Sequence, residues 1–400
     1  MRIMSVQSGT SADGIDVAVV DIAVDDGDRT ALVLTPVSFA TVEWPEPLRA
    51  RILRAMTPKP VTMAEVNELN ALLGRQFGAA AMGHGAGGVD LVVSHGQTVH
   101  HWVDGGVAAG TLQLGEPAWI AEATGAPVLA NLRAADIAAG GQGAPLMGIF
   151  DRLWLQTAAD AREAAVATVN LGGIANVSMV EPGGRVTAWD TGPGNCLIDA
   201  VTNARTGGRL GYDRDGALAA AGTVDEALLE RLMAHPYLEQ EPPKSTGRET
   251  FTLDFVEEAI RAEGYQGLEL ADVVATLTEF TAATLAESLS GRPAAPVSVI
   301  ASGGGVHNPS LMESLKRRTG AHGVELTVSA HHGLDPDAKE NYLFALIGFH
   351  SWHGIASTLP DITGARRPVM LGQLVPAAVG LKLPEPLPPF RRLTVNLIHR

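Results

Sequence analysis

Both halves of the chain open with short strand-like runs that are separated by glycine-rich turns. In the first half, residues 2–6, 15–22 and 31–42 are rich in Val and Ile and alternate in part like strands, with turn residues between them. In the second half, AVATVNLGGIANVSMVE and GRVTAWDTGPGNCLIDAV repeat this arrangement. The sequence therefore predicts two sheets, each of which begins as an antiparallel meander.

Helical patterns follow each set of strands. They cover residues 63–82 in the first half and residues 252–263 and 271–290 in the second half. Residues 133–147, RAADIAAGGQGAPLM, read as a long polar and glycine-rich loop, where we place a domain boundary. A chain of 400 residues is also longer than one typical domain. We therefore predict an α/β protein with two lobes around a cleft.

Charge and cysteine content exclude several classes of partner. The chain has 29 Lys and Arg against 44 Asp and Glu, a formal net charge of −15, and it has no basic tract. A nucleic-acid backbone or an anionic membrane is therefore not expected as the main partner. The single Cys196 rules out an internal disulfide framework, and MRIMSVQSG lacks the apolar core of a signal peptide. Since no apolar run is long enough to span a bilayer, we expect a cytoplasmic protein.

The first glycine-rich turn, SGTSADGID, has the composition of an anion-binding loop. Its backbone N–H groups can turn inward, and its hydroxyl groups can add further hydrogen bonds to a phosphate. A carboxylate beside it, Asp13 or Asp16, can hold a Mg²⁺ ion that bridges phosphate oxygens, with Asp13 as the predicted metal ligand. The alternative is an ordinary hairpin with Asp in its turn. The predicted phosphate-binding residues of this turn are Gly9, Thr10, Ser11, Asp13, Gly14 and Asp16.

Three more loops of this kind each follow an apolar strand: GGIAN, DTGPGN and SGGGVHN. Four such loops in two lobes are typical of a nucleotide cleft. GGGVHNPSLM lies at a strand-to-helix junction and lets the backbone approach a ring or ribose closely, and the alternative is a turn in which Asn308 caps the next helix. The further predicted cofactor-binding residues are Gly172, Gly173, Asn176, Gly303, Gly304, Gly305 and Asn308.

Eight motifs occur in the order found in one known family. They are SGTSADGID, SHGQTVHH, ADIAAGGQGAPL, NLGGIANVS, DTGPGN with IDA, PPKSTGRE, GGGVHNPSLM and DAKEN with FALIG. Together they resemble the anhydro-N-acetylmuramic acid kinase family, from about residue 3 to about residue 373. The resemblance implies the actin-like, sugar-kinase and Hsp70 fold, with two RNase H-like lobes around a central ATP cleft. The implied lobes are residues 1–135 with about 360–400, and residues 136–359.

The reaction of this family sets what the site must do. The family opens the 1,6-anhydro ring with water and phosphorylates O6 of the sugar, using ATP and Mg²⁺, in cell-wall sugar recycling. An inverting glycosidase needs a base carboxylate for the water and an acid for the leaving oxygen. Here the γ-phosphate can capture the leaving O6, so one carboxylate can suffice. Asp190 ends an apolar strand beside a glycine turn and matches the family's base, while the alternative is an Asp that caps this turn.

The resemblance also implies a sugar site. SHGQTVHH offers side chains for sugar hydroxyl groups, and the competing His-only metal site lacks a carboxylate or cysteine at ligand spacing. Arg133, Asp136 and Gln142 are predicted to hold the lactyl carboxylate, ring hydroxyl groups or the loop, since arginine binds a carboxylate bidentately. The predicted substrate-binding residues are Ser94, His95, Gln97, Thr98, Arg133, Asp136, Gln142, Asn195 and Glu340.

Other interpretations of single residues stay open beside these. Lys244, Ser245, Thr246 and Arg248 lie on a loop that is expected to close over the site. Asn195 and Glu340 are expected to position sugar or metal, with an exposed helix surface as the alternative for Glu340. Cys196 is read as a small packed residue rather than a nucleophile.

Two other functions compete with this reading. A kinase for another anhydro sugar such as levoglucosan would keep the chemistry without the lactyl carboxylate, and Arg133 is the feature that separates the two. A nucleotide-dependent binding module of the same fold would hydrolyse ATP slowly and independently of sugar. The expected partner is a small sugar, without nucleic acid or membrane, and the sequence is compatible with a homodimer.

Overall fold

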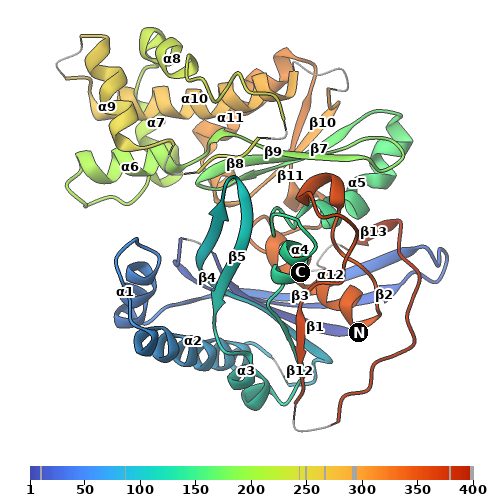
Figure 1. Cartoon of the computed structure of the whole chain (residues 1–400). Helices are drawn as coiled ribbons and strands as arrows, with labels where there is room; N and C mark the ends of the chain where they lie inside the picture. Colours follow the sequence, from blue (N-terminus) through green and yellow to red (C-terminus); the bar gives the residue numbers. More distant parts are fainter. Residues whose placement is uncertain are drawn as a thin grey trace. The chain divides into compact units, whose positions relative to one another are not determined.

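The chain forms two compact units, and it passes from the first to the second and back again (Figure 1). The first unit comprises Met1–Trp154 and Ala338–Arg400, and the second comprises Leu155–Asp337. The structure, a computed structural model, describes residues 1–9, 11–85, 87–242, 244–247, 250–264, 267–290, 295–377 and 380–396. The ATP cleft that the sequence predicts between the lobes stays a prediction.

A mixed sheet forms the centre of the first unit. Among the described residues, its strand order is β12-β6-β4-β1-β2-β3-β13, and β5 pairs with β4. β1, β2 and β3 form an antiparallel meander, whereas β4 lies parallel to β1, with Val6 beside Ser94. The strands are β1 (Arg2–Ser8), β2 (Gly14–Val24), β3 (Ala31–Glu43), β4 (Leu91–Asp104), β5 (Val107–Leu114), β6 (Val128–Ala130), β12 (Gln373–Val375) and β13 (Arg392–Val395).

Helices cover both faces of this sheet, because alternate residues of a strand point to opposite faces. Val92 of β4 belongs to the apolar core shared with α2, while Leu91 and Val93 lie against Gly348 of α12. Helix α2 begins with a capping box in which Thr62 and Glu65 bond each other's backbone N–H. The helices are α1 (Glu46–Ala55), α2 (Met63–Gly83), α3 (Pro117–Thr124), α4 (Ala134–Ala138), α12 (Lys339–Trp352) and α13 (Pro360–Thr363), and α5 (Gly148–Arg162) crosses into the second unit.

The second unit contains a smaller sheet with the strand order β11-β10-β7-β8-β9 among its described residues. α10 is buried along most of its length and packs against β9 and four neighbouring helices. The strands are β7 (Val166–Leu171), β8 (Ile174–Val180), β9 (Val186–Pro193), β10 (Ser298–Ser302) and β11 (Glu325–Val328). The helices are α6 (Cys196–Arg205), η1 (Arg214–Gly216), α7 (Ala217–Ala221), α8 (Glu226–Met233), α9 (Leu253–Ala262), α10 (Leu270–Ser290), η2 (Gly304–His307), α11 (Pro309–Ala321) and η3 (Ser329–His332).

Both sheets share one topology. The core strands of the two sheets lie in the orders β3-β2-β1-β4-β6 and β9-β8-β7-β10-β11. When the five strands of each core are numbered along the chain, both orders are 3-2-1-4-5. In each core the second strand is antiparallel to the first and to the third. The later strands run parallel to the first. This order confirms the prediction of two α/β lobes of RNase H-like topology.

The division of the chain differs from the predicted lobe boundaries, which were 135/136 and 359/360. The units divide at 154/155 and 337/338 instead. Residues 133–147, predicted as a boundary loop, contain helix α4 and belong to the first unit. Helix α12 also belongs there, because it packs on β1, β2 and β4 and buries both polar and apolar side chains against them.

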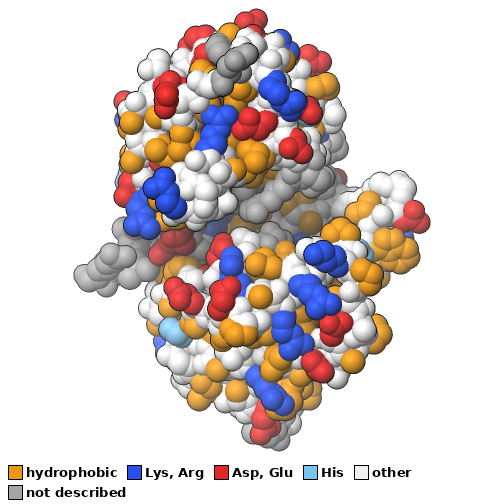
Figure 2. Space-filling model, turned by 90° about the vertical axis from the view of Figure 1, so that its left-hand side faces the viewer, with side chains coloured by type: hydrophobic (Ala, Val, Ile, Leu, Met, Phe, Trp, Pro, Cys, Tyr) orange, Lys and Arg blue, Asp and Glu red, His pale blue; other side chains and the backbone are white. Residues whose placement is uncertain are grey.

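The surface agrees with the mixed charge pattern of the sequence. On the face shown in Figure 2, Lys and Arg side chains lie interspersed with Asp and Glu. Within the described part of the chain, every helix is too short or too polar to cross a membrane.

Candidate active site

The turn between β1 and β2 is held in place by side chains from other strands and helices. Ala12 N donates to Gly9 O at 3.0 Å, and Ala12 has a positive φ of 52°. Gln97 Nε2 donates to the same Gly9 O at 3.0 Å, and Trp44 Nε1 donates to Ser8 Oγ at 3.1 Å. Gln97 therefore orients this turn through the backbone of Gly9. The predicted ligand Thr10 lies outside the described residues.

The two glycines of this turn have different surroundings. A Cβ added at Gly9 would find its nearest neighbour, Ser11 Oγ, at 3.8 Å, so the space beside Gly9 is open. A Cβ added at Gly14 would lie 2.6 Å from Thr41 Cγ2 and 3.0 Å from Val42 O. Gly14 is therefore needed for close packing of β2 on β3, and its contact with phosphate stays a prediction.

The predicted metal ligand Asp13 is paired with a cation of its own chain. Arg49 Nη2 lies 3.3 Å from Asp13 Oδ1, and Arg49 Nε donates to Ala12 O at 3.0 Å. The Asp13 side chain is 72% exposed. Among the described residues, no three His, Cys, Asp or Glu side chains form a metal-binding group. Mg²⁺ needs only one or two carboxylates beside phosphate and water, so this finding does not exclude it.

Two further carboxylates, Asp16 on β2 and Glu340 on α12, lie beyond the turn. Thr41 Oγ1 donates to Asp16 Oδ1 at 2.7 Å and Gln7 Nε2 donates to Asp16 Oδ2 at 3.2 Å. Gln7 Nε2 also donates to Asn341 Oδ1 at 3.3 Å, and Asn341 Nδ2 donates to Asp16 O at 3.1 Å. The sequence stretch DAKEN, residues 337–341, thus brings Glu340 and Asn341 to the end of the first hairpin.

The Glu340 carboxyl has a raised pKa. Burial raises the pKa of the Glu340 carboxyl, and the nearby Asp16 carboxylate raises it further. Arg133 and the hydrogen bond from Gln7 act in the opposite direction. Solvent nevertheless reaches the Glu340 side chain, so a ligand can approach it. The exposed-surface interpretation of Glu340 is therefore incomplete, because the residue takes part in a charged cluster.

His95 and Arg133 form a hydrogen-bonded pair in the first unit. Arg133 Nε donates to His95 Nε2 at 2.8 Å, and Arg133 Nη1 donates to Gly143 O at 2.8 Å. Burial, with the Arg133 guanidinium beside it, holds the pKa of His95 well below the ordinary 6.5. The His95 ring stacks on Phe344 at 4.8 Å between centroids. A neutral His95 accepting at Nε2 leaves the Arg133 charge available to an anion.

Asp136 and Gln142 have structural roles that the sequence did not separate from sugar binding. Asp136 is 0% exposed, and its two oxygens accept from Gly143 N at 2.7 Å and Thr363 Oγ1 at 2.7 Å. Gln142 Oε1 accepts from Ala108 N at 2.8 Å on β5. Both residues therefore hold the loop after α4, which is one of the predicted alternatives. Their direct contact with sugar stays a prediction.

The three other polar residues predicted on β4 are buried or partly buried. Ser94 and Gln97 are 1% and 0% exposed, and Ser94 Oγ and Gln97 Oε1 have no hydrogen-bond partner within the described structure. Thr98 Oγ1 accepts from Gln113 Nε2 at 3.3 Å. Buried polar atoms without partners are uncommon in proteins, and they mark places where a ligand or water can complete the bonding.

Asp190 lies on β9 in the second unit, and residues 245 and 246 hydrogen-bond its carboxylate. Ser245 Oγ donates to Asp190 Oδ2 at 2.8 Å, and Thr246 N donates to the same oxygen at 2.9 Å. Burial raises the pKa of Asp190, while these two hydrogen bonds act in the opposite direction. Tyr237 OH donates to Asp190 O at 2.8 Å, a contact that the sequence reading missed. Arg248 of the predicted closing loop lies outside the described residues.

The glycine-rich loops of the second unit pack against one another where β7, β9 and β10 end. Asn195 N and Gly194 N donate to the backbone of the GGIAN loop, at Gly172 O and Gly173 O, at 2.8 Å and 2.9 Å. A Cβ added at Gly305 would lie 2.6 Å from Leu171 Cβ, and Gly303 has a φ of 83° that favours glycine. Gly304 has open space beside it.

The asparagines of these loops have identifiable local roles. Asn195 Nδ2 donates to Leu171 O at 3.0 Å, and Asn176 lies opposite Asp190 in the β8–β9 pairing. Asn308 Oδ1 accepts from Leu311 N at 3.1 Å, so Asn308 is the N-cap of α11, as the alternative interpretation held. Cys196 is the first residue of α6 and is buried in the apolar core, which confirms its packing role.

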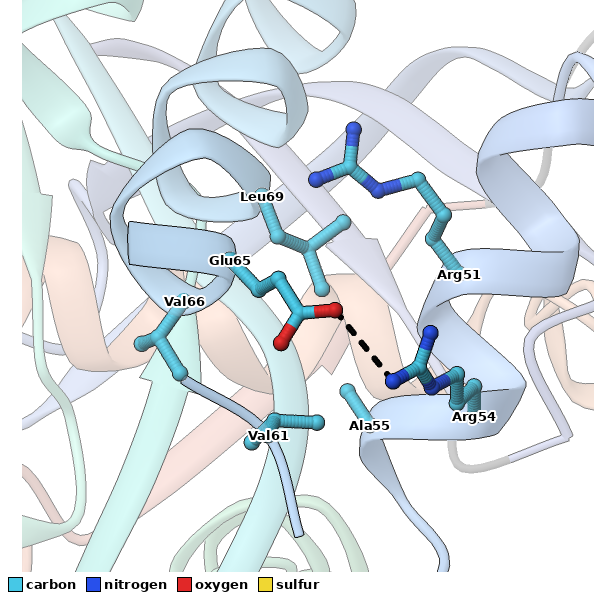
Figure 3. A pocket seen from close by; sticks show the side chains of 7 residues that line it. All are labelled: Arg51, Arg54, Ala55, Val61, Glu65, Val66 and Leu69. Atoms are coloured by element: carbon cyan, nitrogen blue, oxygen red, sulfur yellow. Dashed lines mark ion pairs between the residues drawn. The ribbon is translucent and has the colours of Figure 1, made fainter. Parts of the chain in front are cut away.

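Two surface hollows of the first unit contain none of the predicted site residues. One lies between α1 and α2, where the Arg54–Glu65 ion pair closes its side at 3.2 Å (Figure 3). Its volume of about 40 Å³ admits only a few water molecules. The other has about 410 Å³ and is lined by Ala135, Ala138, Ala139, Arg366, Arg367, Val369 and Met370. The candidate site is therefore defined by its polar side chains, one group in each unit.

Comparisons with known proteins identify similar chains along nearly the whole sequence. The family model described as anhydro-N-acetylmuramic acid kinase matches residues 1–377. A Streptomyces avermitilis protein of that name is 47% identical over 388 residues, covering 96% of this chain and 97% of its own. Relatives of that name from Rhodococcus erythropolis and Streptomyces coelicolor are 44% and 43% identical, covering 95% and 96% of this chain and 96% of each relative.

Solved structures match less closely. The ethanolamine utilization protein EutJ from Carboxydothermus hydrogenoformans is 14% identical, with 86% of this chain and 89% of that chain covered and a TM-score of 0.39. A likeness at this level says nothing about function.

Proposed function

The chain belongs to the anhydro-N-acetylmuramic acid kinase family, and from this premise we propose the reaction that its residues carry out. It is a kinase that acts on a small sugar. The proposed reaction opens the 1,6-anhydro ring of anhydro-N-acetylmuramic acid with water and transfers the γ-phosphoryl group of ATP to O6. The products are N-acetylmuramic acid 6-phosphate and ADP, as cell-wall sugar recycling in the cytoplasm requires.

Asp190 is the proposed general base. Water attacks C1, its proton passes to the Asp190 carboxylate, the C1–O6 bond breaks and O6 takes the phosphoryl group from ATP. The single observation that supports this role best is a partly buried carboxylate with one oxygen held by two donors and a raised pKa. A base whose pKa lies nearer to the working pH accepts a proton more effectively.

The first unit supplies the proposed sugar and phosphate contacts. Arg133 uses Nε and Nη1 within the protein, while Nη2 has no hydrogen-bond partner in the described structure. We propose that this side of the guanidinium holds the lactyl carboxylate. The unsatisfied Ser94 Oγ and Gln97 Oε1 are proposed to complete their bonding with sugar or with ordered water.

The donor set near the first hairpin fits Mg²⁺. Asp16 and Glu340 provide two carboxylates of the oxygen type that Mg²⁺ prefers, and they fit better than the Arg49-paired Asp13. When bound at Asp16 and Glu340, the ion would supply positive charge that stabilises the phosphoryl group during transfer. Gly9, with open space beside it, is the proposed backbone approach for the phosphates.

The test measures ADP release with four samples: anhydro-N-acetylmuramic acid, levoglucosan, plain N-acetylmuramic acid and no sugar. We expect ADP release with the first sugar alone, and Asp190→Asn should lower that turnover by about two orders of magnitude or more while ATP still binds. Asp254→Asn, an exposed residue in the first turn of α9, is the matched control. Normal turnover of Asp190→Asn would show that another carboxylate is the base.

The competing functions give different results in the same assay. A levoglucosan kinase would release ADP faster with levoglucosan than with anhydro-N-acetylmuramic acid. A nucleotide-dependent binding module would release ADP slowly and at the same rate in all four samples.

A further inference from the structure

The two oxygens of the Asp190 carboxylate have different environments. Oδ2 accepts from Ser245 Oγ at 2.8 Å and from Thr246 N at 2.9 Å. Oδ1 accepts no hydrogen bond from any described residue. The carboxylate is therefore anchored through one oxygen, and the other remains able to accept a proton.

The segment that supplies these donors is itself fixed to Asp190. Asp190 N donates to Lys244 O at 3.1 Å, and Tyr237 OH donates to Asp190 O at 2.8 Å. Lys244 Nζ donates to Tyr237 O and Leu238 O at 3.2 Å and 3.1 Å and lies 4.8 Å from the Tyr237 ring centroid. Backbone and side-chain bonds thus bring Ser245 to the carboxylate in one defined orientation.

We propose that Ser245 is a positioning residue. Its hydrogen bond fixes Oδ2 of Asp190, so that Oδ1 is the atom that takes the proton from water. This inference rests on the proposed function, in which Asp190 is the base. Ser245 does not touch the sugar in this scheme. It acts through Asp190, by fixing the carboxylate plane and by stabilising its charged form.

The electrostatic consequence follows from the groups that face Asp190. Burial raises the pKa of Asp190, and the hydrogen bonds from Thr246 and Ser245 lower it in part. Tyr237 faces it as a neutral phenol, because burial and Asp190 raise the Tyr237 pKa, and the Lys244 ammonium is directed to carbonyl groups. Loss of the Ser245 hydroxyl must therefore raise the Asp190 pKa.

The experiment compares pH profiles of kcat/KM for anhydro-N-acetylmuramic acid in the full-length protein and its variants. The acid limb of that profile gives the pKa of the catalytic base in the free enzyme. Ser245→Ala should move the limb to higher pH by about half a unit to one unit, since a hydrogen bond to a charged group contributes roughly one to two pH units when buried and less where water replaces it. The Thr246 N–H bond persists in this variant, so Asp190 stays anchored.

Two further variants separate positioning from general damage. Ser245→Thr keeps the hydroxyl group and should restore the limb to its original pH. Ser290→Ala removes a hydroxyl that donates to Glu287 O at 3.2 Å at the end of α10, and it should leave the profile unchanged.

The outcomes distinguish this inference from the proposed function. If Asp190→Asn is inactive and Ser245→Ala has the original acid limb, Asp190 remains the base and the inference about Ser245 is wrong. A uniform fall in kcat/KM at every pH, without a shift of the limb, would overturn it as well. If Asp190→Asn is fully active, Asp190 is not the base and both proposals fail.

Discussion

A buried ion pair joins the two places where the chain passes between units. Lys339 Nζ lies 2.7 Å from Asp151 Oδ1, and the two side chains are 6% and 0% exposed. Asp151 precedes the first crossing on α5, and Lys339 follows the second at the start of α12. The Lys339 ammonium also lies 5.7 Å from the ring of Trp154. Asp151→Asn keeps the shape of this side chain and removes its negative charge.

The expected loss follows from burial. Two unit charges at this distance attract by about 6 kcal/mol at an effective dielectric constant of about 20, and the desolvation of both groups opposes much of this. Removing one partner leaves the other charge buried and uncompensated, which costs roughly 3–5 kcal/mol. In a unit of about 200 residues, this loss corresponds to a fall in Tm of roughly 6–20 °C.

Differential scanning calorimetry of Asp151→Asn, Lys339→Met and the double variant tests the reasoning. Both single variants break the same pair. The loss of stability in the double variant should therefore be smaller than the sum of the two single losses, by about 1–3 kcal/mol. Glu68→Gln is the control: it breaks the exposed Arg51–Glu68 pair at 3.1 Å and should cost about 1 kcal/mol or less. A Tm for Asp151→Asn within about 2 °C of the original, or strictly additive losses, would show that the buried pair contributes little to stability.

Two other predictions concern the first unit. Gly14→Val should destabilise the unit by roughly 1–3 kcal/mol, because its side chain would meet Thr41 and Val42, whereas Gly9→Val should weaken ATP binding with little change in Tm. Calorimetric ATP titration and melting of both variants check this pair, and the reverse pattern would contradict it. Burial lowers the pKa of His350 to about 4, below its unfolded value, so the unfolded state binds the proton more readily. Stability should therefore fall by up to about 3 kcal/mol as the pH drops from 6.5 to 4. His350→Gln should flatten that decline in urea unfolding, and an equally steep decline would show that other groups cause it.

Local sequence patterns predicted most of the secondary structure. The helices expected at 63–82, 252–263 and 271–290 are confirmed as Met63–Gly83, Leu253–Ala262 and Leu270–Ser290. The meander expected from residues 2–6, 15–22 and 31–42 is confirmed as β1, β2 and β3. Such patterns are readable because helix and strand periodicity, turn residues and caps depend on neighbours in the sequence.

The roles of single glycines and polar residues were less readable. The turn composition of SGTSADGID did not separate Gly9, which has open space beside it, from Gly14, which packs against β3. Likewise, ADIAAGGQGAPL did not show that Asp136 accepts from Thr363 across 227 residues of sequence. In both cases the deciding neighbour comes from a distant strand or helix.

The elements, the two-lobe α/β class and the residue types available for chemistry can be read from the order of residues along the chain. Which of these residues meet depends on long-range contacts: Ser245 reaches Asp190 across 55 residues, and Gln7 reaches Asn341 across 334. Such contacts follow from the order of the strands and from the packing of helices on the sheet. Because β4 pairs in parallel with β1, and α12 packs over β1, β2 and β4, groups that no local pattern connects are placed within hydrogen-bond distance.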